Sequence, residues 1–431
     1  MAKVWDKLSN LISGLGTSRD KASGTEYCDR SLTDADLTNA YRNAWLPRKI
    51  VEIPALDACR KWRQWSADAK QISAIEAEET RLGLRLKARE ALTKARLYGG
   101  GGIIIGDGSR DPSKPLDPAT IGLGGIKYLA VISRQYLTST ELDMDPASKY
   151  WLKPKMYRLA TGSDQVDIHP SRVVTFIGND HPDPQLANPW QGWGDSVLKA
   201  AWEACLNSDS TLANVASLVF ESKVDVISIP GLTDKVSDSD FREAIITRMT
   251  LAATGKGING ALLLDSEETY EQKSATFSGL DAIIDRFLQV VSGAADIPTT
   301  RLLGRSPAGM NSTGEGDLRN YYDSVQAIQE LEIGPEMALL DECLIRSALG
   351  ARPEEVHYNW ASLWQTSDIE RAEIGEKIAK TIETLAKTRL IPDDALAATA
   401  VNMLTEAGLA PGLEQAVEDA PDDEDSDDDA I

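Results

Sequence analysis

Two histidines near acidic residues are the side chains with the clearest capacity to bind a metal. His169 and His181 stand close in sequence to Asp167, Asp180 and Asp183, and imidazole and carboxylate groups are common metal ligands. An apolar, strand-like run separates the two histidines, and nothing in the spacing puts both on one face of it. Motifs for phosphate loops, nucleophilic serines or helical zinc sites do not occur. We therefore expect no metal, no cofactor and no catalytic residue.

A pair of acidic residues offers the other arrangement that could support a reaction. Glu315 and Asp317 are two positions apart beside a glycine-rich stretch. Two-metal sites use such carboxylates to hydrolyse phosphodiesters, but a flexible neighbour would hold this pair poorly for catalysis. A metal-dependent DNA hydrolase stays an alternative function for the chain.

The glycine-rich stretch itself, residues 301–316, is the most distinctive part of the sequence. Its glycines lie among polar residues, a composition that favours an exposed loop. A helical pattern follows directly, with apolar residues at spacings of three and four, until Gly334 and Pro335 interrupt it and predict a kink. We expect a mobile loop joined to a long, kinked helix. The predicted loop hinges are Gly304, Gly309, Gly314 and Gly316.

The charge balance limits how the chain can bind nucleic acid. The 431 residues include 45 Lys and Arg against 67 Asp and Glu, for a net charge of −22. Ten of the acidic residues lie between Glu414 and Asp429, a composition typical of a disordered tail. The remainder is still acidic, which argues against tight binding along a phosphate backbone. We expect any contact with DNA to be confined to a few basic side chains.

Cysteine spacing and hydropathy indicate a protein of a reducing compartment that is not embedded in a membrane. The four cysteines are far apart, with no pair at metal-ligand spacing, and we expect buried free thiols. No apolar run reaches the ~20 residues that a membrane helix needs. Near the N-terminus a short amphipathic stretch predicts an arm that docks on a neighbour or stays disordered. Its apolar residues are Val4, Trp5, Leu8, Leu11 and Ile12.

The elements around the loop predict an α+β fold. Residues 33–190 combine helical patterns with several strand-like runs. Two long helical patterns follow, at 196–222 and about 269–295, and a compact strand–helix–strand insert lies between them. The chain therefore runs out along one helix and returns along another, which places the insert at the tip of a stalk.

The stretch RLLGRSPAGMNSTGEGDLRNYYD, residues 301–323, resembles the signature of a bacteriophage portal-protein branch often found in prophages. The similarity extends over roughly residues 25–365. The resemblance implies a mostly helical portal fold with an α/β wing, a two-helix stem, a small α/β clip, a kinked tunnel helix and a small helical crown. It divides the chain into an arm at 1–26, a wing at 27–195, stem helix 1 at 196–222, a clip at 223–265, stem helix 2 at 266–297, a tunnel loop at 298–316, a tunnel helix at 317–350, a wing return strand at 351–366, crown-like helices at 367–410 and an acidic disordered tail at 411–431.

The resemblance also implies a structural function. Portal proteins form rings, typically dodecamers, at one capsid vertex, and double-stranded DNA is packaged and ejected through the ring without sequence specificity. The implied partners are the major capsid protein, the terminase large subunit and the head–tail adaptor, and the implied location is the virion, with host cytoplasm during assembly. The residues expected to face DNA are Arg301, Arg305, Ser306, Asn311, Ser312 and Thr313.

Three alternatives remain open at this point. Both arginines could pair within the protein, with Glu315 or Asp317 as partners. The chain could be the DNA hydrolase considered above or another viral accessory enzyme. It could also be a monomeric binding module that uses the loop as a lid.

Overall fold

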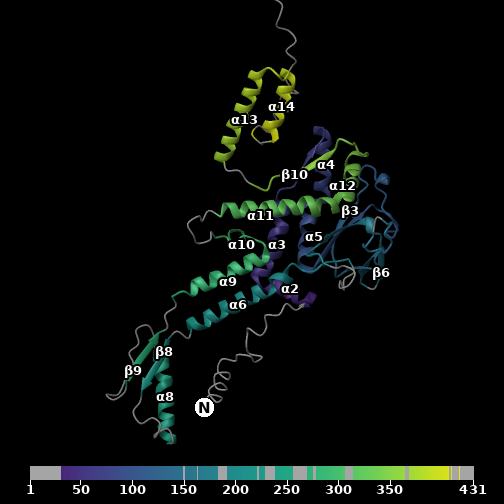
Figure 1. Ribbon diagram of the computed structural model, residues 1–431. Coiled ribbons are helices and arrows are strands. Elements are labelled where there is room, and N and C mark those ends of the chain that lie inside the picture. The colour runs from purple at the N-terminus through teal and green to yellow at the C-terminus, as the bar shows by residue number, and fades with distance from the viewer. Residues whose placement is uncertain are drawn as a thin grey trace, which may run out of the picture. The chain divides into compact units, whose positions relative to one another are not determined.

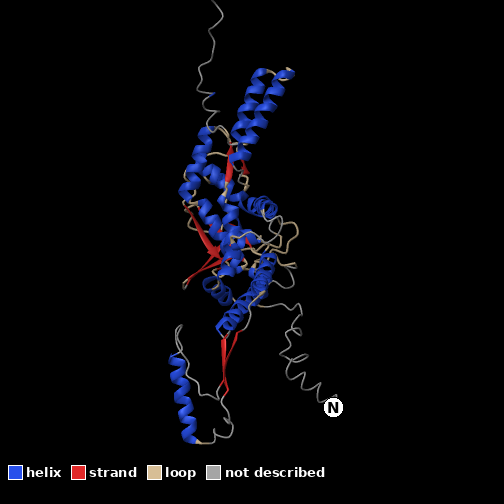
Figure 2. Cartoon of the chain, turned by 90° about the vertical axis from the view of Figure 1, so that its left-hand side faces the viewer, coloured by secondary structure: helices blue, strands red, loops and turns tan. Residues whose placement is uncertain are grey.

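A computed structural model of the protein describes most of the chain from residue 31 to residue 406. The fold is α+β and mostly helical, with small antiparallel sheets (Figure 2). The chain divides into two compact units, residues 1–361 and 362–431, and each is considered by itself. The described residues are 31–148, 151–162, 164–182, 192–220, 223–228, 238–255, 269–274, 278–305, 314–364, 368–406, 409 and 417.

The described part of the first unit starts with four helices (Figure 1). The helix α5 is lined with alanines that are completely buried, and their small side chains let the next strand lie directly on the helix. A Cβ atom at Gly101 of that strand would approach the carbonyl oxygen of Ala91 to 2.3 Å. Gly99 ends the helix with φ +88°. Gly99 therefore allows the helix to end, and Gly101 allows the strand to pack closely on it. The helices are α2 (Asp34–Asn43), α3 (Trp45–Arg60), α4 (Ala69–Leu82) and α5 (Leu84–Tyr98).

Two three-stranded antiparallel sheets follow the helices. In one, β2 is central between β3 and β7, and in the other β5 is central between β4 and β6. A cluster of buried residues that includes Leu137, Tyr157 and Trp193 packs between strands of both sheets. Short 3₁₀ turns lie at Pro118–Thr120 and Pro170–Arg172. The strands are β2 (Gly100–Gly106), β3 (Tyr128–Ser133), β4 (Leu137–Ser139), β5 (Tyr157–Thr161), β6 (Asp164–Ile168) and β7 (Val173–Ile177).

A two-stranded sheet joins the start of the unit to its end. The strand β1 (Arg63–Ser66) pairs antiparallel with β10 (His357–Trp360). The side chain of Arg63, in β1, is fully buried, forms ion pairs with Glu79 and Asp341, and lies over the ring of Tyr358. A buried guanidinium is tolerated when carboxylates neutralise it and aromatic faces surround it.

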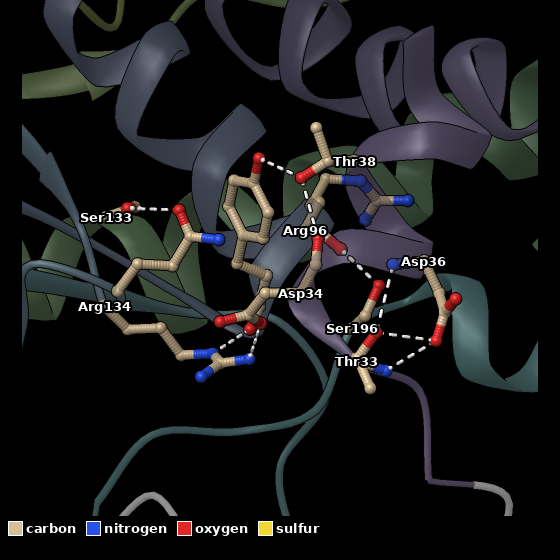
Figure 3. Close-up of polar contacts among 10 residues, drawn as sticks. Thr33, Asp34, Asp36, Thr38, Arg96, Ser133, Arg134 and Ser196 are labelled. Atoms are coloured by element: carbon tan, nitrogen blue, oxygen red, sulfur yellow. Dashed lines mark hydrogen bonds and ion pairs between the residues drawn. The ribbon is translucent and has the colours of Figure 1, made fainter. Parts of the chain in front are cut away.

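The junction of α2, α5 and the following chain is held by side chains that Figure 3 draws. Arg134 donates to Asp34 at 2.6 Å, and Thr33 and Asp36 form the capping box that begins α2. The backbone oxygen of Arg96 accepts the hydroxyl of Ser196 at 3.3 Å. These contacts fix the point from which the next long helix departs.

That helix, α6 (Leu198–Phe220), lies beside α9 (Leu280–Ala295) (Figure 1). The chain between them contains the strands β8 (Lys223–Ser228) and β9 (Thr269–Ser274), which pair antiparallel, and the helix α8 (Ser239–Gly255).

The position of β9 corrects the predicted boundary of the second stem helix. Residues 269–274 were expected to begin that helix, yet they form a strand, and α9 begins only at Leu280. The six-residue ladder with β8 satisfies the backbone groups of both segments, and the apolar spacing within this short stretch does not distinguish a helix from a strand. Residues 256–268, which include the end of the predicted clip at 223–265, lie outside the described residues.

The helices that follow α9 form the rest of the first unit. They are α10 (Thr299–Leu303), α11 (Glu315–Ile328), a π-helical turn (Gln329–Ile333) and α12 (Gly334–Leu349). The predicted break at Gly334 and Pro335 is therefore a π turn that ends where these two residues begin α12. The buried side chain of Gln329 donates to the carbonyl oxygen of Ala58 at 2.7 Å, which ties the turn to the end of α3.

The second unit contains the helices α13 (Asp368–Thr388) and α14 (Asp393–Glu406), which pack on each other. Both lie within residues 367–410, where helices were expected from the sequence. No helix in the described ranges combines the length and apolar character needed to cross a membrane. The predicted N-terminal arm and most of the predicted acidic tail lie outside the described residues.

Candidate nucleic-acid interface

The predicted tunnel loop is shorter in the structure than in the sequence analysis. The helix α10 occupies part of the predicted range 298–316, because Pro298 stands at its N-cap and Leu302 is completely buried. The helix α11 begins at Glu315, so Gly316 is helical rather than part of a loop. Between these two helices the structure describes Gly304, Arg305 and Gly314. Ser306, Gly309, Asn311, Ser312 and Thr313 lie outside the described residues, and their place in a loop and their contact with DNA stay predictions.

Arg301 is paired inside the protein. It lies on α10, and its Nε and Nη2 each donate to Asp57 of α3 at 2.9 Å. The side chain of Asp57 is 1% exposed and also accepts the hydroxyl of Tyr321, on α11, at 3.0 Å. Hydrogen bonding to Asp57 is the largest cause that raises the pKa of Arg301, although burial opposes it. A buried carboxylate with three such donors is a stable anchor.

This anchor changes what Arg301 can do for the loop. Intramolecular pairing was one of the two alternatives, but the partner is Asp57 and not Glu315 or Asp317. To reach a phosphate, Arg301 would have to leave a buried carboxylate without its main charge partner, which is costly. The arrangement instead joins α3, α10 and α11 at one point, on both sides of the loop.

Asp57 was missed in the sequence analysis. It stands in α3 among the buried residues Ile53, Ala55, Ala58 and Cys59. An acidic residue in an apolar stripe needs a partner, since lone buried charges are strongly unfavourable. The pattern could have marked Asp57 as paired, but it could not have identified Arg301 as the partner, because the two are 244 residues apart in sequence.

Arg305 is in a different environment. Its guanidinium pairs with Asp285 of α9, and the side chains of the two residues are 51% and 40% exposed. Exposed pairs of this kind contribute little and exchange readily with other partners. Of the two arginines that were expected to face DNA, Arg305 can therefore exchange its carboxylate partner for a phosphate with little loss of free energy.

Two glycines mark the ends of the loop. Gly304 ends α10 with φ +73°, and Gly314 stands at the N-cap of α11 with φ +62°, a conformation that favours glycine. A Cβ at Gly304 would meet open space, whereas one at Gly314 would lie 2.6 Å from Cγ2 of Thr300. Across the base of the loop, Lys49 of α3 donates to the carbonyl oxygen of Leu302 at 2.7 Å. Both ends of the loop are thus fixed on the same helices.

A pocket of about 490 Å³ lies between the turn after α9 and one face of α11. Arg96 lines it and donates to the carbonyl oxygens of Ile50 and Val51, at 3.0 and 3.3 Å. Burial lowers the pKa of Arg96 to about 10, which leaves it cationic at neutral pH. Because Arg96 belongs to α5 and its hydrogen bonds go to backbone oxygens of α3, it joins these two helices.

The side chains that could bind a metal do not form a metal site within the described residues. His169 accepts the backbone N–H of Ser171 at 3.1 Å and begins a 3₁₀ turn, and Asp183 lies outside those residues. Among the described side chains, no group of three or more His, Cys, Asp or Glu residues could hold a metal ion. Burial raises the pKa of three buried thiols to about 12, those of Cys59, Cys205 and Cys343.

Known proteins resemble this chain over most of its length. The chain is 40% identical over 430 residues to an anti-CBASS protein Acb1 of Caulobacter sp. (strain RHG1), a match that covers 96% of this chain and 68% of the relative. A protein of the same name from Sphingomonas paeninsulae is 38% identical with the same coverage. Among solved structures, a chain from the neck of the native gene transfer agent particle, computed with C12 symmetry, has a TM-score of 0.53 and 15% identity, and the match covers 94% of this chain and 99% of that one.

The family of this chain is shown by a family model that matches most of the first unit and part of the second. A model of the family described as phage portal protein matches residues 35–384, a range that includes α3, α10, α11 and the loop between them. The gene transfer agent structure shows the same fold at low identity. This chain therefore belongs to the phage portal protein family.

Proposed function

We propose that the chain forms a ring at one capsid vertex through which double-stranded DNA is packaged and ejected. The family match over residues 35–384 carries the proposal. The fold that this chain shares with a chain of a particle neck computed with C12 symmetry supports a dodecamer. A ring requires two unlike faces on each copy, since heterologous contacts close only by rotation.

The described elements take the following roles in this proposal. The helices α6 and α9 are the stem, and β8, α8 and β9 form the clip. The wing is built from the elements between α2 and β7 together with β10, and α13 with α14 forms the crown. The tunnel loop runs from Arg305 to Gly314, and α11, the π turn and α12 form the tunnel helix. The clip is the docking surface for the terminase and later for the head–tail adaptor, while the wing meets the major capsid protein.

We assign the two arginines at the loop different roles. Arg301 holds α10 to α3 through Asp57. Arg305 contacts DNA phosphates as they pass. The acidic first turn of α11, with Glu315 and Asp317, repels phosphate and prevents tight holding. DNA that must move through a channel is better served by weak, transient contacts than by strong ones.

The loop is tested by replacing residues 306–313 with a glycine–serine linker of the same length, which keeps both capped ends in place. We expect rings to assemble as in the unaltered protein and DNA packaging or retention to fall. As a matched control, the same replacement of residues 109–115, a surface segment after β2, should leave packaging unchanged. Normal packaging by the loop variant would remove the proposed role of the loop.

The proposal gives the chain no catalytic step, which distinguishes it from the hydrolase alternative. That alternative predicts DNA cleavage that depends on Mg²⁺ or Mn²⁺ and disappears in Asp317→Ala. We expect no cleavage by the purified chain with or without these ions. Cleavage that Asp317→Ala abolishes would replace the structural function by an enzymatic one.

Both relatives reported above are named anti-CBASS protein Acb1, and this name refers to an activity that the portal family does not explain. About a third of each of those proteins lies outside the match to this chain. We assign the anti-CBASS function in their name to that additional part, because the shared part carries the portal family match. Anti-CBASS activity of this chain by itself would contradict the assignment.

A further inference from the structure

One arginine of the first unit is taken out of water without an acidic partner. The side chains of Arg63, Arg134 and Arg172 are at most 6% exposed, and each of them pairs with an Asp or Glu. Arg96 instead donates only to two backbone oxygens and forms no ion pair with a described residue. Neutral carbonyl groups do not cancel a positive charge, and a cation removed from water is normally paired. Arg96 therefore lacks a counterion.

A proline in α3 explains the two hydrogen bonds that Arg96 makes. Pro54 lies inside that helix and has no N–H, so the carbonyl oxygen of Ile50, four residues earlier, has no partner within the helix. Arg96 supplies the missing donor, because its Nη2 lies 3.0 Å from the oxygen of Ile50. Its Nε lies 3.3 Å from the oxygen of Val51. One edge of the guanidinium is thus fixed on α3.

The second edge of the same guanidinium is available to a ligand. Arginine carries five N–H donors in a planar fork, and the bonds to Ile50 and Val51 use one donor of Nη2 and the donor of Nε. The remaining donors, on Nη1 and Nη2, have no partner among the described residues. They form an edge that can bind both oxygens of a carboxylate or a phosphate group. Because the first edge is fixed, the second is preorganised for an anion.

The pocket of about 490 Å³ between the turn after α9 and α11 gives this edge a place for a ligand. Arg96 lines the pocket, whose size suits a small organic molecule. Asp296 and Asp317 also line it, and both residues are exposed, so water screens their charges. The pKa of Arg96 responds to Glu332 and Tyr321 and not to these two aspartates.

The lining favours an anion that carries a single charge. A phosphate carries about two negative charges at neutral pH, so the two aspartates repel it more strongly than they repel a carboxylate. Ala295, Pro298 and Ile328 are half-buried in the lining and can pack against a short apolar chain. The pocket is therefore better suited to a carboxylate on an apolar body than to a phosphate.

We propose that the pocket between the turn after α9 and α11 binds a small organic carboxylate with a short apolar body, whose two oxygens accept hydrogen bonds from the second edge of Arg96. The bound carboxylate supplies the counterion that Arg96 lacks. The ligand is a soluble small molecule, and its binding requires neither DNA nor ring formation, so this proposal is independent of the proposed function.

The first test is equilibrium dialysis of the full-length protein against labelled butyrate. We expect saturable binding of one butyrate per chain, and weaker binding of inorganic phosphate because the aspartates repel it. No saturable binding of butyrate, or tighter binding of phosphate, would overturn the proposal. An acidic side chain of a neighbouring copy is another source of the same chemistry; butyrate bound by single chains but not by assembled rings would show that source and overturn the assignment to a soluble ligand.

Two substitutions remove the site in different ways. Arg96→Gln keeps an amide donor for the oxygen of Ile50 but loses the charge and the second edge, and should weaken butyrate binding at least ~tenfold. Ser324→Leu leaves the contacts of Arg96 with α3 in place and fills part of the pocket, so it should prevent binding. Ala327→Leu adds similar bulk at an exposed position of α11 outside the lining and should leave binding unchanged. Equal binding by Ser324→Leu and Ala327→Leu would contradict the assignment of the pocket.

A change of charge gives a test in which binding improves. Asp296→Asn removes one negative charge from the lining at nearly constant shape, and asparagine tolerates the φ of +55° at this position. Butyrate should bind about two- to fivefold more tightly to this variant. Asp281→Asn makes the same charge change at an exposed residue of α9 outside the lining and should have no effect. Identical affinities of the two variants would refute an anion site in this pocket.

Discussion

The anchor between α3, α10 and α11 leads to a prediction that separates two arginines only four positions apart. Arg301→Ala removes both hydrogen bonds that the guanidinium donates to the buried Asp57. Arg305→Ala removes the exposed contact with Asp285. The two changes delete the same kind of side chain, so a difference between them measures the environment and not the residue type.

The magnitude follows from the burial of the two partners. Loss of one partner of a fully buried pair costs ~3–5 kcal/mol. The side chain of Arg301 is 29% exposed, and Asp57 keeps the hydroxyl of Tyr321 at 3.0 Å and Arg60 at 3.5 Å. We therefore expect Arg301→Ala to cost about 2–3 kcal/mol in local stability. Arg305→Ala should cost at most about 0.5 kcal/mol.

Native-state hydrogen exchange of the amides in α10 and α11 is the suitable assay, because it reports local opening within a protein of more than one unit. A third variant, Arg301→Lys, keeps the charge and loses the two-pronged donor, and should fall between the other two. The reasoning fails if Arg301→Ala and Arg305→Ala open these helices equally, or if Arg301→Lys behaves like the unaltered protein.

Two further predictions concern the ends of the loop and a buried ion pair. Gly314→Ala should cost more than Gly304→Ala, because both residues have positive φ but only the first would place a Cβ 2.6 Å from Cγ2 of Thr300; thermal unfolding should show this order, and Thr300→Ser, which lacks that methyl, should recover part of the loss. Although burial raises it, hydrogen bonds led by that from Arg172 lower the pKa of Asp107 from 3.8 to about 2. The pair therefore stabilises the fold above pH 4, and that stability is lost as the pH falls toward 2. The stability difference between the unaltered protein and Asp107→Asn, measured by urea unfolding, should shrink by about 2 kcal/mol over that range, and a difference independent of pH would show that the ion pair does not stabilise the fold.

Long, strongly patterned helices could be predicted from the sequence with small errors. The helical pattern at 196–222 corresponds to α6 at Leu198–Phe220, and α13 and α14 lie within the helical range predicted at 367–410. Such helices bury one continuous face, and their periodicity extends over many turns.

Segments whose structure depends on a distant partner could not be predicted in the same way. The strand β1, which contains Trp65, exists only because β10 pairs with it almost 300 residues later in sequence. The strand β9 was expected to be helical and depends in the same way on β8. Local periodicity over four to six residues does not decide between helix and strand, and the tertiary partner does.

In the candidate site, too, local features could be predicted from the sequence and contacts with distant residues could not. Composition alone predicted a loop at residues 301–316, whereas the structure has one helix ending before Gly304 and the next beginning after Gly314. The roles of Arg301 and Arg305 could not be separated in sequence, since both are arginines beside glycines. Only their partners, a buried Asp57 for one and an exposed Asp285 for the other, distinguish an anchor from an available cation.

The central claim is that many copies of this chain surround an axial channel. The most direct test is electron microscopy of the purified full-length protein, with the mass of the particle measured on the same sample. We predict rings with an open centre and a mass corresponding to twelve chains of 46.8 kDa. A stable monomer under all conditions tested, with the loop folded over a closed pocket, would contradict the account.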